Sequence, residues 1–156
     1  MITLWDRVKM QPNELRDRFT HIIKKYNSHF NEGDYEISFL IAQSLFEDRV
    51  NVLWILGTWF NLSEDYWDVL KPDVRETKNK SITSKIYELK DWEVIDYPTA
   101  NRWKKIMIVR NNLIHFSLFN TDEYTEKNSS QFFKEFRVAD KIIGEFKTQT
   151  NFYESK

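Results

Sequence analysis

Apolar residues recur every three or four positions along most of the chain, the spacing that places them on one face of an α-helix. Five segments carry this pattern, and they predict helices over residues 12–28, 35–60, 81–92, 98–118 and 130–146. Residues 61–80 and 120–130 are polar and weakly periodic, so they are predicted to be loops. The tail, 148–156, is predicted to fray. The fold class expected is all-α, an up-and-down bundle of four to five helices in a single domain over 1–156.

The segment 35–60 is the most apolar part of the chain, and its apolar residues cover more than one helical face. A helix that is apolar nearly all round is stable only when other elements surround it. The sequence therefore predicts that this helix lies at the centre of the bundle. Its apolar positions include Ile37, Leu40, Ile41, Leu45, Val52, Leu53, Ile55 and Leu56.

Composition narrows the range of functions. The chain has no cysteine, which excludes disulfide frameworks, thiolate zinc sites and cysteine nucleophiles. Its net charge of −1 argues against a protein that coats nucleic acid with a broad basic face, because such binding needs many phosphate contacts. Any contact with RNA or DNA is then expected to be local.

The first ten residues, MITLWDRVKM, mix acidic and basic side chains where a secretory signal needs a cationic region followed by an apolar run. No later segment of the sequence has the length and apolarity of a membrane span. We therefore expect a cytoplasmic protein with no membrane partner.

One short stretch combines an arginine and a histidine inside an apolar segment: Arg110-Asn-Asn-Leu-Ile-His115. The spacing alone is weak evidence, because Arg16 and His21 form a second match. Their surroundings differ: His21 lies on the polar side of a predicted helix, whereas Arg110 and His115 have isoleucine, valine, leucine and phenylalanine around them. Polar groups in an apolar setting are partly desolvated, so they need partners and their pKa values can shift.

Helical geometry brings the polar members of this stretch together. Asn111 and His115 are four residues apart and share one face of a helix. Arg110 is displaced from His115 by about 140°, but its long side chain can swing back toward the histidine. The three side chains are therefore predicted to border one cleft.

The stretch VRNNLIHF resembles the signature of the HEPN superfamily, all-α domains that carry arginine, a polar residue that is often asparagine, a few further residues and then histidine. The resemblance implies a metal-independent endoribonuclease of the toxin or phage-defence type, with Arg110, Asn111 and His115 as catalytic residues. It also implies a homodimer, RNA as the substrate, and a cognate antitoxin or regulatory protein as a further partner. One branch of the superfamily has a tyrosine two residues after the histidine, which its antitoxin modifies, and this chain has Ser117 there.

The implied chemistry suits these side chains. Histidine, with an ordinary pKa of about 6.5, can accept the proton of a ribose 2′-hydroxyl or donate one to the leaving 5′-oxygen. Arginine carries a permanent positive charge that stabilises the charge building up on the phosphate. Because the RNA supplies its own nucleophile, no metal and no cofactor are expected. One histidine does not readily serve as acid and base in the same step, so a composite site across a two-fold dimer axis is expected.

Glu47 and Asp48 form an acidic pair inside the most apolar segment. At least one of them is expected to point at the cleft and to orient Arg110 or His115. The alternative is a salt bridge with Arg49 or with another helix.

Three cations lie just before the motif on the same predicted helix: Arg102, Lys104 and Lys105. They are candidates to bind RNA, because they would raise the positive potential at the entrance of the cleft. The alternative is an ordinary solvated helix face.

A second hypothesis for the function comes from a different class. The chain would then be a catalytically inactive helical module for dimerisation or for RNA or nucleotide binding. In such a module, Arg110 and His115 close a buried polar network at an interface.

Overall fold

The computed structural model describes residues 4–61, 80–115 and 121–152, and every regular element in these ranges is an α-helix. The predicted all-α class is confirmed. The six helices are α1 (Leu4–Lys9), α2 (Pro12–Asn31), α3 (Tyr35–Asn61), α5 (Ile82–Asp91), α6 (Tyr97–His115) and α7 (Asp122–Gln149). Most of the predicted loop over 61–80, and the predicted helical residues 116–118, lie outside the described residues.

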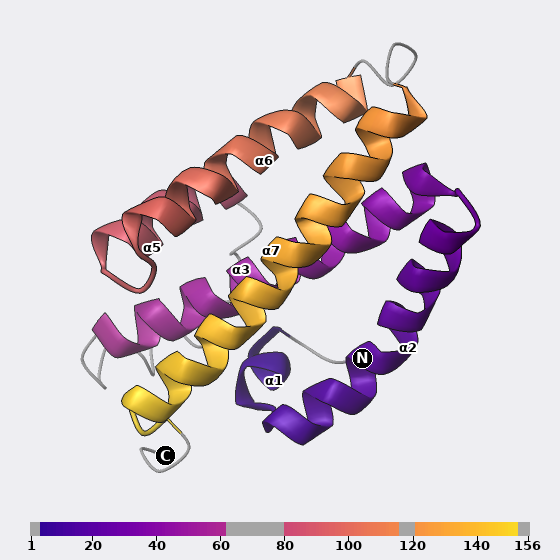
Figure 1. The fold of residues 1–156 in the computed structure, drawn as a ribbon. Coiled ribbons are helices and arrows are strands. Elements are labelled where there is room, and N and C mark those ends of the chain that lie inside the picture. Colours follow the sequence, from indigo (N-terminus) through magenta and orange to yellow (C-terminus); the bar gives the residue numbers. More distant parts are fainter. Residues whose placement is uncertain (1–3, 62–79, 116–120, 153–156) are drawn as a thin grey trace.

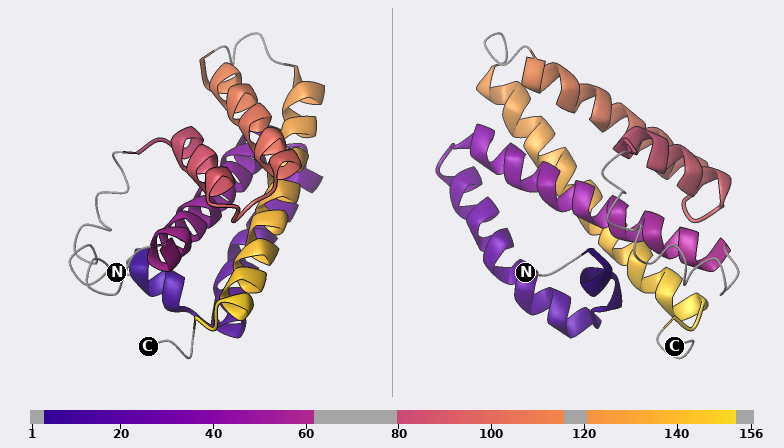
Figure 2. Two further views of the ribbon diagram at one scale, coloured as in Figure 1. Left: turned by 90° about the vertical axis from the view of Figure 1, so that its left-hand side faces the viewer. Right: turned by 180° about the vertical axis from the view of Figure 1, so that it is seen from behind.

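Helices α3 and α7 cross at the centre of the molecule and make its most extensive helix pair (Figure 1). Helices α1 and α2 lie on one side of this pair, and α5 and α6 lie on the other (Figure 2). The predicted central position of residues 35–60 is confirmed, because α3 contacts α1, α2, α5 and α7. Two of its apolar residues were expected in the core and are exposed: Ile37 by 45% and Leu40 by 54%. No described helix covers that side of the first turns of α3.

Helix α7 begins at Asp122, so the prediction of a loop over 120–130 is wrong. The backbone signal for the helix was present: the Thr121 side chain accepts a hydrogen bond from the Tyr124 N–H at 3.2 Å, which caps the first turn. The periodic pattern of apolar residues was absent from this part of the sequence, because polar side chains form the buried face of the first turns of α7. Ser129 is fully buried, and its hydroxyl lies 2.8 Å from that of Ser38 on α3.

Three helices end in the same way. A residue with positive φ follows the helix, and the next N–H reaches back five residues, which is the Schellman motif. The positive-φ residues are Gly33 after α2, Glu93 after α5 and Asn151 after α7. After α7, the Phe152 N–H bonds the Lys147 carbonyl at 3.0 Å. This turn buries Phe152 completely, so the prediction that the whole tail frays is wrong for its first part.

Helix α1 was not predicted, because residues 4–9 are too short to show a period. Tertiary contacts hold it: Val8 is fully buried, and the Arg7 Nε donates to the Asp48 Oδ1 at 2.7 Å. Isolated helices of this length are unstable in water, so packing on α3 is the cause of the helix.

Helix α6, which carries the Arg–His stretch, is anchored by Trp103. This side chain is fully buried, with its ring centroid 5.3 Å from that of Phe46 on α3. Its Nε1 donates to the Glu135 carboxylate on α7 at 3.1 Å. The buried indole thus fixes both the depth and the rotation of α6 against the central pair.

Two helical glycines provide a matched test of the packing. A Cβ at Gly57 in α3 would lie 2.9 Å from the Trp92 ring, whereas a Cβ at Gly144 in α7 would meet nothing within 4 Å. Gly144→Ala should therefore raise the free energy of unfolding by about 0.5–1 kcal/mol through helix propensity. Gly57→Ala should lower it by about 1–3 kcal/mol through overpacking. Chemical denaturation measures both, and equal effects would contradict this packing of Trp92 on α3.

Candidate functional site

Arg110 lies where α6 leaves the core. In the preceding turn, Ile106 and Met107 are buried against the central helices. Arg110 follows on the same side of α6, and its side chain is 31% exposed. Asn111, the next residue, is exposed. The arginine is therefore held beside the core with its charge accessible from one side.

The guanidinium of Arg110 is only partly satisfied. One terminal nitrogen donates to the Asn111 Oδ1 at 3.1 Å, and the other lies 3.6 Å from the Glu47 Oε1, which is an ion pair beyond ordinary hydrogen-bond length. Its Nε is buried without a hydrogen-bond partner among the described residues. Arg110 therefore retains donors and positive charge for a ligand.

These residues line a cavity of about 400 Å³ between α3, α5 and α6. In the part of the chain that the structure describes, the lining is mostly polar and includes three cations and one carboxylate. It consists of Glu47, Asn51, Lys80, Ser81, Ile82, Thr83, Lys85, Met107, Arg110 and Asn111. We call this cavity the Arg110 pocket.

Lys85 is the member of the pocket that sequence reasoning missed. Its side chain is only 2% exposed, and its Nζ donates to the Asn51 Oδ1 at 2.6 Å and lies 5.5 Å from the Trp54 ring centroid. Burial lowers the pKa of Lys85, and the positive charge of Lys80 lowers it further, against the opposite effect of nearby carboxylates. The only sequence signal was its place beside Ile86 on the inward edge of α5.

Lys80 stands at the edge of the pocket with a carboxylate of its own. Its ammonium pairs with Glu88, whose other oxygen accepts a hydrogen bond from the Trp54 Nε1 at 2.8 Å. Glu88 is not part of the lining, so even when it is counted the pocket has three cations against two carboxylates. The local charge is positive in a chain whose total is −1.

The two acidic candidates point to different sides of α3. Glu47 faces the Arg110 pocket. Asp48 faces α1, with its oxygens 2.7 Å from the Arg7 Nε and 2.7 Å from a terminal nitrogen of Arg49 on α3 itself. Glu47 is therefore the residue positioned to orient Arg110, and Asp48 makes the salt bridge that was the alternative.

The three upstream cations are not part of the pocket lining. The Arg102 Nε lies 3.3 Å from both oxygens of the buried Glu135 carboxylate on α7, and Lys104 stacks 4.4 Å from the Tyr87 ring centroid on α5. Lys105 is exposed. A role in RNA binding remains a prediction for all three.

The His115 side chain lies outside the described residues, but the helix is continuous to this position. A helix places His115 about 40° from Asn111 and about 6 Å further along the axis. His21, the histidine of the second match, is exposed on α2, on the other side of the central pair.

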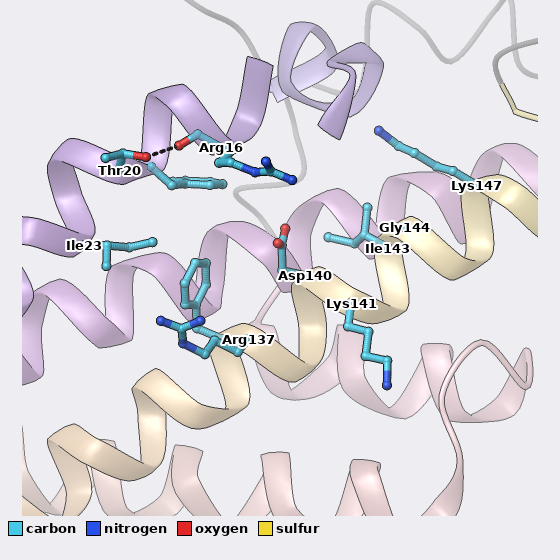
Figure 3. Close-up of a pocket in the computed structure, with 11 residues that line it drawn as sticks. Arg16, Thr20, Ile23, Arg137, Asp140, Lys141, Ile143, Gly144 and Lys147 are labelled. Atoms are coloured by element: carbon cyan, nitrogen blue, oxygen red, sulfur yellow. Dashed lines mark hydrogen bonds between the residues drawn. The ribbon is translucent and has the colours of Figure 1, made fainter. Parts of the chain in front are cut away.

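A second cavity of about 330 Å³ lies between α2 and α7 (Figure 3). Arg16, Thr20 and Ile23 reach into it from α2, and Asp140 points toward it from α7. Asp140 is paired with the buried Arg49 at 3.4 Å. Neither Arg110 nor Asn111 lines this cavity, so we do not assign the site there.

Within the described ranges, one group of side chains has metal-ligand spacing: His29, Glu32 and Asp34, whose ligand atoms all lie within 4.8 Å of one another. His29 is in the last turn of α2, and Glu32 and Asp34 follow in the turn before α3. The His29 Nδ1 already lies 3.3 Å from the Asp34 Oδ2. Exposed acidic turns are common without an ion, so this turn is not assigned as a metal centre.

No protein-family model matches the chain, and neither a curated protein nor a solved structure matches it. Among the described helices, none combines the length and the apolarity that crossing a membrane requires. The geometry and charge of the Arg110 pocket therefore carry the functional interpretation.

The burial of Lys85 predicts a pH-dependent stability. Because the folded pKa is lowered from 10.5, the unfolded chain binds more protons than the folded chain between the lowered value and 10.5. The free energy of unfolding should therefore rise with pH across that interval, and Lys85→Met should lack this rise. At neutral pH the variant should be as stable as the wild type or up to about 1 kcal/mol more stable, since a buried charge is replaced by an apolar chain.

Denaturant titrations of both proteins from neutral to alkaline pH measure this effect. Lys24→Met, which changes an exposed lysine on α2, is the control and should follow the wild type. Parallel curves for wild type and Lys85→Met would show that Lys85 titrates normally.

Proposed function

We propose that the chain is a metal-independent endoribonuclease of the HEPN type, with an HEPN-like up-and-down arrangement of its helices. The observation that supports it most is the incompletely satisfied Arg110, held with Asn111 and Glu47 at a cationic pocket. A surface arginine without such a role would be free in solvent, and a purely structural one would have its donors paired.

Each residue of the motif has a role in this proposal. Arg110 stabilises the negative charge that develops on the phosphate, and Glu47 and Asn111 set the direction of its guanidinium. His115 accepts the proton of the 2′-hydroxyl, and His115 of a second copy protonates the leaving 5′-oxygen. The bond from the 2′-oxygen to phosphorus forms as the bond to the 5′-oxygen breaks, so no water or metal enters this step.

One observation favours the second hypothesis, an inactive dimerisation or RNA-binding module. The 3.6 Å pair between Arg110 and Glu47 could serve only to join α6 to α3. However, Glu47 is itself 25% exposed and the distance is long, so the carboxylate does not consume the guanidinium.

His115→Ala and Arg110→Ala should each slow RNA cleavage in the presence of EDTA. The expected loss is about 10²–10⁴-fold for the histidine, as for a general acid or base, and about 10²–10³-fold for the arginine. The measurement is the cleavage rate of mixed single-stranded RNA. The matched control is His21→Ala, which removes the histidine of the second Arg–His match and should leave the rate unchanged. Equal inertness of all four proteins would support the inactive module instead.

We further propose that the active form is a homodimer. Large apolar side chains are exposed near the motif: Leu40 lies two helical turns from Glu47 on the same side of α3, and Ile37 is beside it. Ile108, 62% exposed, is on α6. Exposed apolar side chains grouped around a polar site are typical of interaction surfaces. Such a dimer, placed in the cytoplasm and restrained by an antitoxin or regulatory protein, completes the proposal.

Leu40→Glu should shift the protein toward monomer and lower its RNA cleavage in parallel, because the carboxylate would be buried in the interface. Tyr97→Glu changes a side chain that is 65% exposed at the start of α6 and should alter neither property. Sedimentation equilibrium measures the association. A wild-type monomer with full activity would refute the composite site.

A further inference from the structure

We propose that the Arg110 pocket is a backbone-phosphate subsite for single-stranded RNA, in which Lys85 anchors a phosphate that the Arg–His motif also contacts through Arg110. This inference rests on the proposed function for the identity of the strand. It adds a positioning residue, on a different helix, to the residues of the motif.

The charge of the pocket favours an anion. Lys80, Lys85 and Arg110 line it together with one carboxylate, Glu47, and Glu88 offsets Lys80 from outside the lining. Lys85 has 2% of its surface exposed, so its charge is screened less by water and salt than that of a surface lysine. A buried cation facing a polar cavity is stabilised when an anion enters.

The fixed geometry supports the same ligand. The Nζ of Lys85 is held by the Asn51 Oδ1 at 2.6 Å, so binding would order little that is not already ordered. Across the pocket, the Arg110 Nε is buried without a partner in the described structure. The first residues of α5 also line the cavity, and the positive end of a helix dipole adds to the same field.

The lining also indicates which part of a nucleotide is recognised. Among the ten described residues that line it, none is aromatic, and Ile82 and Met107 are the apolar members. Base recognition in single strands depends mainly on stacking against aromatic rings. The pocket therefore suits the sugar–phosphate backbone, and its contribution to binding should be independent of base sequence.

The test uses 2′-O-methyl oligoribonucleotides, which carry backbone phosphates but lack the hydroxyl nucleophile, so binding is separated from cleavage. Oligouridylate and oligoadenylate are bound to wild type, Lys85→Met and Lys24→Met at several KCl concentrations. Lys85→Met should weaken both oligomers by a similar factor, roughly tenfold, and should reduce the slope of log K against log salt by about one. The control Lys24→Met should bind as the wild type does.

A second variant has the opposite expected sign. Glu47→Gln removes the one carboxylate among the described residues of the lining and should strengthen binding of both oligomers several-fold. A misfolded variant would not bind more tightly, so a gain supports the subsite independently of Lys85→Met. No gain, together with an unchanged affinity and salt slope in Lys85→Met, would overturn it.

Two further measurements distinguish an RNA phosphate from a small phosphate ligand, and the phosphate subsite from the proposed nuclease activity. Inorganic phosphate and AMP are titrated while the NMR signal of the Trp54 indole N–H, which bonds Glu88, is followed. Saturable binding of either, with RNA affinity unaffected in Lys85→Met, would assign the pocket to a small ligand and overturn the RNA subsite. The other outcome is that Lys85→Met loses affinity for RNA while the wild type cleaves no RNA. That result would reject the proposed nuclease activity and support the phosphate subsite.

Discussion

The arrangement of the helices depends on the buried guanidinium of Arg49. Its side chain has no exposed surface; it pairs with Asp48 at 2.7 Å and Asp140 at 3.4 Å and lies 4.7 Å from the Phe19 ring centroid. A buried charge without partners is strongly destabilising, so the ion pair with Asp140 favours the position at which α7 crosses α3. Through Asp48, the same network reaches Arg7 and holds α1. The ion pairs of this network thus join α1, α3 and α7, and Arg49 also contacts α2 through Phe19.

This network explains why two neighbouring acids have different roles. Successive residues of a helix point about 100° apart, so Asp48 and Glu47 face different sides of α3. Asp48 is occupied by the structural pair with Arg49, and Glu47 is left for Arg110 on α6. The ion pairs that build the fold and those at the candidate site are therefore separate, and a change at Glu47 can alter the pocket without loosening the core.

The candidate site shows how a chain of nearly neutral total charge can suit a polyanion. Positive charge is concentrated at one cavity by a buried lysine and a half-buried arginine, while Arg102 is offset by the buried Glu135. A field of this kind acts over a short range and falls with added salt. In the proposed function, such a field favours contact with one part of an RNA strand over broad binding along a duplex, in line with the expectation from the net charge of the chain.

The sequence by itself determined the helical class, the central place of α3 and the position of Arg110 and Asn111 on one late helix, because apolar periodicity and helical spacing are local properties. Only the tertiary structure decided which acid of α3 faces Arg110, and that Lys85 is buried against Asn51. Only the tertiary structure shows that the start of α7 is helical despite its polar face, because the Ser129 hydroxyl hydrogen-bonds that of Ser38 on α3. Such partners are distant in the sequence, and no periodicity within a single helix encodes them.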